Sequence, residues 1–173
     1  VARRAIEAGA NVINDIWGAK KDPEMANVVV EYDVPIILMH NREEPKYENI
    51  MDEIVADLHD SIEIVKSGGA THEQHILDPG IGFGKTFEQN LYVMRNLETI
   101  TQLGYPVLLG TSRKSMIGLA LNLPPNERME GTGATVCLGI EKGCKIVRVH
   151  DVKPISRMVK MMDAMLKGPV LNG

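Results

Sequence analysis

The sequence has few aromatic residues and no excess of basic charge. Phe, Trp and Tyr make up 4% of its 173 residues, and 19 Lys and Arg stand against 23 Asp and Glu, a formal net charge of −4. An acidic chain lacks the broad basic surface typical of nucleic-acid binders, so any anion site must be local. No apolar run approaches the ~20 residues that a membrane span needs. We therefore expect neither a nucleic acid nor a membrane as partner.

Cysteine is also scarce, and the chain does not start with Met. Cys137 and Cys144 stand seven residues apart with no CxxC motif, which is typical of reduced thiols in a cytoplasmic protein rather than of a disulfide framework. The chain begins at Val1, and residues 1–9 have the pattern of a helix end rather than of a signal peptide. We therefore expect that the N-terminal part of a longer protein is missing.

Short apolar strands alternate with helices along the chain. Strands are expected at 11–16, 34–39, 75–78, 106–109 and 145–149, and helices at 22–32, 48–66, 86–103, 114–121, 126–142 and 154–166. This alternation predicts a parallel α/β sheet in one domain at 1–168, followed by a tail at 169–173.

Every expected strand ends in polar residues. This suits a (β/α)₈ barrel, whose strands all point to one mouth, better than an open doubly wound sheet, whose site lies at one switch point. A full barrel takes ~250 residues, so this chain is about three βα units short of one.

The most unusual segment is DPGIGFGKT at 78–86. Its end resembles a P-loop, but Pro79 stands where a P-loop needs Gly, so that interpretation fails. Asp78 is expected at a strand tip, where its carboxylate can accept two N–H bonds from a planar heterocycle. The alternative is that Asp78 only caps its own loop.

The segment LLGTSRKS at 108–115 predicts an anion site. A strand runs there into a helix start, whose free N–H groups and dipole favour an anion. Lys114 adds a charge and Ser115 a hydroxyl. The alternative is that Ser112 only caps the helix and Lys114 is solvated.

Arg148 and His150 stand two residues apart on the last expected strand and so share one face. An Arg fork beside an imidazole suits phosphate or pyrophosphate. Arg in a buried strand is costly unless paired, so the alternative is an ion pair with Asp151 or Asp15.

Other polar residues carry weaker signals. Asn14 ends the first strand with an amide that can read a heterocycle edge, although Asn is also common in turns. No zinc spacing and no Ser/Cys–His nucleophile motif is recognised, and His40 belongs to no such pattern.

Together these segments resemble the dihydropteroate synthase family of the folate pathway. The matching segments are IND at 13–15, ILMHNR at 37–42, LDPGIGFGKT at 77–86, LLGTSRKS at 108–115, EGTGAT at 130–135 and RVHDV at 148–152. They follow the family's order and cover nearly the whole chain. The resemblance implies the C-terminal part of a TIM (β/α)₈ barrel, about strands 4 to 8.

The resemblance also implies an activity. The enzyme would be a transferase that condenses 6-hydroxymethyl-7,8-dihydropterin pyrophosphate with p-aminobenzoate, with Mg²⁺ assisting, to give 7,8-dihydropteroate and pyrophosphate. It would be a homodimer, and sulfonamides would compete with p-aminobenzoate.

Particular residues take roles by the same resemblance. The catalytic residues would be Lys114, Arg148 and His150, of which Arg148 and His150 bind the pyrophosphate. Ser115 and the helix start would hold the p-aminobenzoate carboxylate. The complete set of expected substrate-binding residues is Asn14, Ile16, Met39, Asp78, Gly82, Phe83, Gly110, Lys114, Ser115, Arg148 and His150. No metal ligand is expected in this fragment.

Part of the family pattern has no counterpart here. The loops after the family's first two strands and the aspartate that ends its third strand are absent, so the isolated chain is expected to have little synthase activity. One rival is a methyltetrahydrofolate-binding methyltransferase domain, which would not need the Arg148–His150 pair. The other is a non-catalytic pterin-binding fragment or scaffold.

Overall fold

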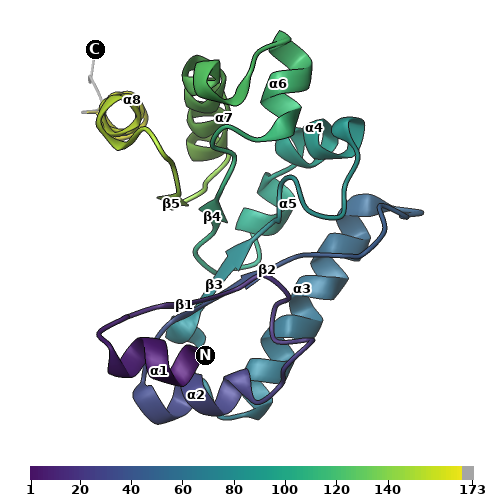
Figure 1. The fold of residues 1–173 in the computed structure, drawn as a ribbon, viewed down its shortest axis with the longest axis vertical. Helices are drawn as coiled ribbons and strands as arrows, with labels where there is room; N and C mark the ends of the chain where they lie inside the picture. Colours follow the sequence, from purple (N-terminus) through teal and green to yellow (C-terminus); the bar gives the residue numbers. More distant parts are fainter. Residues whose placement is uncertain (169–173) are drawn as a thin grey trace, which may run out of the picture.

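Helices and strands alternate in the computed structural model, which describes residues 1–168 (Figure 1). The tail expected at 169–173 therefore lies outside the described residues. The elements are α1 (Ala2–Glu7), β1 (Ile13–Asp15), α2 (Met25–Tyr32), β2 (Ile36–Met39), α3 (Ile50–Ser67), a 3₁₀ turn (His72–Gln74), β3 (His75–Asp78), α4 (Phe87–Arg95), α5 (Glu98–Thr101), β4 (Leu108–Leu109), α6 (Ser115–Leu121), a second 3₁₀ turn (Pro125–Glu127), α7 (Met129–Glu141), β5 (Ile146–Val147) and α8 (Val152–Lys167).

All strand pairings are parallel, which confirms the predicted α/β class. Strand β1 pairs with β2 and β2 with β3, while β4 pairs with β5. A parallel bridge between Leu77 and Val107 joins the two groups, so the strands lie side by side in chain order. In Figure 1 the strands run through the middle, with α1 to α3 at one end and α6, α7 and α8 at the other.

The core lies between the sheet and its helices. All four residues of β2 are buried, as a continuous apolar run predicts for a strand covered on both faces. Helix α3 presents Ile54, Leu58 and Val65 to the core, and each of them is fully buried. Burial of each such side chain contributes ~1.5–3 kcal/mol, so α3 is a main support of the sheet.

The helix expected at 86–103 is two helices. Its start is confirmed as a capping box, since Thr86 N donates to Gln89 Oε1 at 2.8 Å and Gln89 N donates to Thr86 Oγ1 at 3.3 Å. The first helix, α4, ends at Arg95. The side-chain Nδ2 of the next residue, Asn96, donates to Tyr92 O at 2.8 Å, and the chain turns before α5 begins. Asn favours such local bonding over a helix interior.

The last strand is shorter and less buried than expected. It spans only Ile146–Val147, and both residues are half-buried. Among the described residues β5 has β4 as its one neighbour, and Arg148 follows the strand with 47% of its side chain exposed. The premise that Arg148 lies inside a buried strand is therefore wrong.

Within the described residues, no helix combines the length and the apolar composition that crossing a membrane requires.

Candidate functional site

Arg148 brings distant polar residues together at the carboxyl ends of the strands. Its Nη1 donates to Asn14 Oδ1 at 2.7 Å, and its Nη2 lies 3.4 Å from Asp78 Oδ2. Asn14 belongs to β1 and Asp78 ends β3, while Arg148 follows β5. In a parallel sheet these strand ends meet at one edge, which is where ligands of such folds bind.

Asp78 caps its own loop with one carboxylate oxygen and turns the other toward Arg148. One oxygen, Oδ1, accepts from Gly80 N at 2.8 Å and so caps the loop. The other, Oδ2, faces Arg148. Asp78 is 1% exposed, and burial raises the pKa of its carboxyl, while the Gly80 N–H and the charges of Arg148 and Lys114 oppose that rise.

Lys114 is directed inward, so the alternative of a solvated lysine is wrong. Its Nζ donates to the carbonyl oxygen of Ile81 and lies 4.6 Å from the centre of the Phe83 ring. Burial lowers the pKa of Lys114 to about 8, although the Asp78 charge works against that shift. A Cβ at Gly82 would lie 2.9 Å from Lys114 Cδ, so Gly82 leaves space for this side chain.

Ser112 contacts His150 and does not cap α6. Its Oγ lies 2.9 Å from His150 Nδ1 and accepts from His150 N at 3.1 Å. The N-cap position of α6 is held by Lys114, without a side-chain cap bond. Ser112 is therefore a site residue that is missing from the expected set, because a serine before a helix has the same local pattern in both roles.

Part of this group borders one hollow of about 320 Å³. It is lined by Gly110, Ser112, Lys114, Arg148, Val149 and His150. A Cβ at Gly110 would lie 2.9 Å from Arg148 Nη2, so any larger residue there would displace the guanidinium. Arg148 and His150 thus line the same hollow, but Val149 lines it too and β5 ends at Val147, so the alternation of a strand is not the reason.

Neither acid expected as the alternative partner of Arg148 pairs with it. Asp15 accepts hydrogen bonds from the backbone N–H groups of Trp17 and Ala19 at 3.0 and 2.6 Å. Asp151 pairs with Arg113, with Oδ1 2.7 Å from Nη2. This alternative is therefore wrong, because each of the two acids has other partners.

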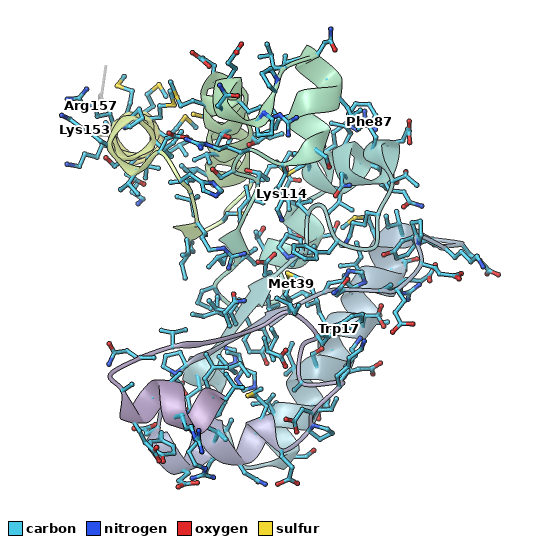
Figure 2. All side chains as sticks on the ribbon, in the orientation of Figure 1. Trp17, Met39, Phe87, Lys114, Lys153 and Arg157 are labelled. Atoms are coloured by element: carbon cyan, nitrogen blue, oxygen red, sulfur yellow. The ribbon has the colours of Figure 1, made fainter. Side chains whose placement is uncertain are left out.

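The remaining expected residues differ in how far they are buried. Met39, at the end of β2, is 1% exposed, whereas Ile16 is 43% exposed. Phe83 is half-buried, and Ser115, the first residue of α6, is exposed. Figure 2 shows Met39 and Lys114 in the central part of the molecule, while Lys153 on α8 lies at its outside.

The donor set for a metal is incomplete. Residues 1–168 contain no group of three or more His, Cys, Asp or Glu side chains that could hold a metal ion. The residues described here therefore do not by themselves fit the expected Mg²⁺.

Fold and site together define a class: parallel α/β proteins that carry a ligand site with a buried carboxylate and several cations at the strand ends. Within this class, the family model described as pterin binding enzyme matches residues 1–150. The chain belongs to the pterin-binding enzyme family.

Several relatives are closely similar. The dihydropteroate synthase of Bacillus subtilis is 61% identical, with 100% of this chain and 61% of that protein aligned. The dihydropteroate synthase of Clostridium beijerinckii is 61% identical over 96% of this chain and 62% of its own length. A crystal structure of the Clostridium difficile dihydropteroate synthase in the presence of pteroic acid matches with a TM-score of 0.93 and 48% identity, covering 95% of this chain and 63% of that one. The chain thus spans about three fifths of the length of these relatives.

Proposed function

We propose that this chain is the C-terminal part of a dihydropteroate synthase, with residues 1–168 forming about strands 4 to 8 of a TIM barrel. The reaction would join 6-hydroxymethyl-7,8-dihydropterin pyrophosphate to p-aminobenzoate, and release 7,8-dihydropteroate and pyrophosphate. The observation that carries the proposal is the convergence of Asn14, Asp78 and Arg148 at one site. The similarity to dihydropteroate synthases supports the same assignment.

Asp78 and Asn14 would recognise the pterin edge. A buried carboxylate with one oxygen held by Gly80 N keeps its other oxygen aimed at the site. That oxygen and the Asn14 amide have Arg148 as their partner in the structure. The pterin edge would replace Arg148 there, since its N–H groups offer the same donors.

Arg148 and His150 would then serve the leaving group. In the reaction the p-aminobenzoate nitrogen forms a bond to the pterin methylene carbon as the C–O bond to pyrophosphate breaks, and the amine loses a proton. Such a displacement needs no protein nucleophile. The cationic Arg148, with His150 oriented by Ser112, would stabilise the charge that develops on the pyrophosphate.

Lys114, Ser115 and Phe83 would border the two substrates. Lys114 holds a place beside Asp78, and its Nζ lies over the Phe83 ring. Ser115 is exposed at the start of α6, where a carboxylate can reach its hydroxyl and the first backbone N–H groups. Sulfonamides would compete for this p-aminobenzoate position, and Ile16, Met39, Gly82 and Gly110 would form the surrounding walls.

Further properties of the whole protein are part of the same proposal. A homodimer is supported by exposed apolar side chains on α8, including Met161, Met165 and Leu166. A cytoplasmic location is supported by Cys137 and Cys144, which are both free thiols. Mg²⁺ is proposed as cofactor, but no step is assigned to it, because the described residues do not complete a metal site.

The test is an assay of the protein at its full natural length. Formation of dihydropteroate from the two substrates is expected, together with binding of the pterin measured by calorimetry. Pterin binding without turnover would favour a scaffold. Methyl transfer from methyltetrahydrofolate, with no response to pyrophosphate, would favour the methyltransferase alternative.

A further inference from the structure

Lys85 bonds back to the loop in which it stands. Its Nζ lies 3.1 Å from Gly80 O, 3.0 Å from Phe83 O and 2.9 Å from His40 Nδ1. Burial lowers the pKa of Lys85 to about 7, so below that pH the group is an ammonium with three N–H donors and no acceptor, and these three partners use all of its donors. Lys85 has none left for a ligand, and its role must lie in the shape of this loop.

A neutral His40 is the partner that this arrangement requires. Its side chain is fully buried, and burial lowers its pKa to about 4, so the ring carries one proton at neutral pH. Because Nδ1 accepts from Lys85, that proton lies on Nε2, which donates to Asp57 Oδ2 at 3.0 Å. Asp57 is in turn held by Lys20 at 3.0 Å and by Arg42 Nε at 2.8 Å. A chain of contacts thus runs from α3 to the loop after β3.

The loop held by Lys85 also carries two contacts of the proposed pterin site. Gly80 N donates to Asp78 Oδ1, and the carbonyl oxygen of Ile81 accepts from Lys114 Nζ. Lys85 and Lys114 therefore bind neighbouring carbonyl groups of one short loop. If the loop changed shape, both the Asp78 carboxylate and the Lys114 ammonium would lose a fixed partner.

We propose that Lys85 is a positioning residue of the pterin site, with His40 as its acceptor and Asp57 as the anchor of His40. The inference rests on the proposed function, because it assigns the site that Lys85 serves. Lys85 itself touches no substrate. It holds the carbonyl groups of Gly80 and Phe83, and thereby the loop that orients Asp78 and Lys114.

The test compares Lys85→Met with the unchanged protein at its full natural length. Met keeps the length of the side chain and removes all three donors. At about pH 6, calorimetry with 6-hydroxymethyl-7,8-dihydropterin is expected to show an affinity about tenfold or more lower, and the affinity for inorganic pyrophosphate should change by less than about twofold. Hydrogen exchange of the backbone at 79–86 should become faster. A general structural defect would instead lower both affinities and the melting temperature together.

The matched control is Lys66→Met. Lys66 is an exposed lysine on α3 that pairs with Glu63 at 3.1 Å, so its loss also removes one lysine contact. Both affinities and the exchange of 79–86 are expected to stay unchanged. As a second variant with a retained charge, Lys85→Arg should also lose pterin affinity, because a planar fork cannot reach the same three acceptors.

Variants of His40 test whether Lys85 needs the hydrogen-bond acceptor of this residue. His40→Asn offers an amide oxygen in place of Nδ1 and should keep most of the pterin affinity, whereas His40→Leu should lose it. The double variant Lys85→Met with His40→Leu should bind the pterin no worse than Lys85→Met. Both substitutions remove the same hydrogen bond, so their effects should not add.

Unchanged pterin affinity in Lys85→Met, or equal losses for pterin and pyrophosphate, would overturn the positioning role. Unchanged hydrogen exchange would overturn the loop contact itself. If the protein without any substitution does not bind the dihydropterin, the proposed function is wrong, and so is the role of Lys85 in pterin binding.

Discussion

At the scale of single residues, the site is a balance of opposite charges around one buried carboxylate. Asp78 faces Arg148 across 3.4 Å, and Lys114 reaches the loop beside it. Burial raises the pKa of Asp78 and lowers that of Lys114, so each charged form depends on the other. Substitutions of these residues should therefore affect the two halves of the ligand differently.

Arg148→Ala should weaken pyrophosphate binding far more than pterin binding. Hydrogen bonds to charged groups contribute ~1.5–3 kcal/mol, so the pyrophosphate affinity should fall by about 10- to 100-fold. Calorimetry with each ligand alone measures the two losses. Arg157→Ala, an exposed arginine on α8, is the control and should change neither. Equal losses for both ligands would argue against the assignment of Arg148.

Lys114→Ala should weaken pterin binding at neutral pH by about 10-fold or more. The substitution removes the donor to Ile81 O and a positive charge beside Asp78. Loss of a buried charge-assisted hydrogen bond corresponds to about 10-fold or more in affinity. Calorimetry with a dihydropterin is the measurement, and an affinity equal to that of the unchanged protein would refute the role.

Pterin affinity should also depend on pH through Lys114. Its pKa in the folded protein is about 8, below the usual ~10.4, so the ammonium is present below pH 8 and is lost above it. Affinity should therefore fall as the pH rises through 8, and Lys114→Met should remove that fall. Between the two pKa values the unfolded chain binds more protons, so this residue makes the free energy of unfolding rise with pH. Titrations by calorimetry and by urea unfolding separate the two effects.

At the scale of elements, helix α3 supports the sheet and also anchors the site. Its buried side chains cover β2, while its Asp57 holds His40 and Arg42. The apolar spacing that predicts this helix does not reveal the second role.

Leu58→Ala should destabilise the fold without changing the site directly. Leu58 is fully buried, and truncation of such a residue costs ~2–5 kcal/mol. Urea unfolding followed by circular dichroism measures the loss. His59→Ala changes the next residue, which is exposed, and should stay within about 0.5 kcal/mol. A loss for Leu58→Ala no larger than that of the control would contradict the assignment of this core.

At the scale of the whole molecule, the described sheet has two open edges. Strand β1 pairs only with β2 and β5 only with β4 among residues 1–168. Exposed strand edges present unpaired N–H and C=O groups and promote association between chains. A barrel would pair these edges, as the proposed function implies.

Joining the chain to the N-terminal part of the Bacillus subtilis relative should therefore raise its melting temperature and reduce aggregation. The expected gain comes from pairing the open edges, and synthase activity should appear with it. Thermal melting and static light scattering measure the outcome. Fusion to an unrelated domain of similar size is the control, and an equal gain from that fusion would show that edge pairing is not the cause.

Much of this protein follows from local patterns in its sequence. Buried apolar runs such as 36–39, the capping box at Thr86 and the polar residues after each strand are local features, because burial and helix initiation depend on neighbouring residues. They suffice for the parallel α/β class and for the edge at which Asp78 and Arg148 meet.

The choice of partners was decided only by the tertiary structure. Arg148 bonds to Asn14, 134 residues away, rather than to the nearby Asp151, and Lys85 bonds to His40, 45 residues away. Ser112 contacts His150 instead of capping the helix that follows it. A hydrogen bond requires atoms to lie within about 3 Å, and for residues so far apart along the chain only the folded backbone sets that distance.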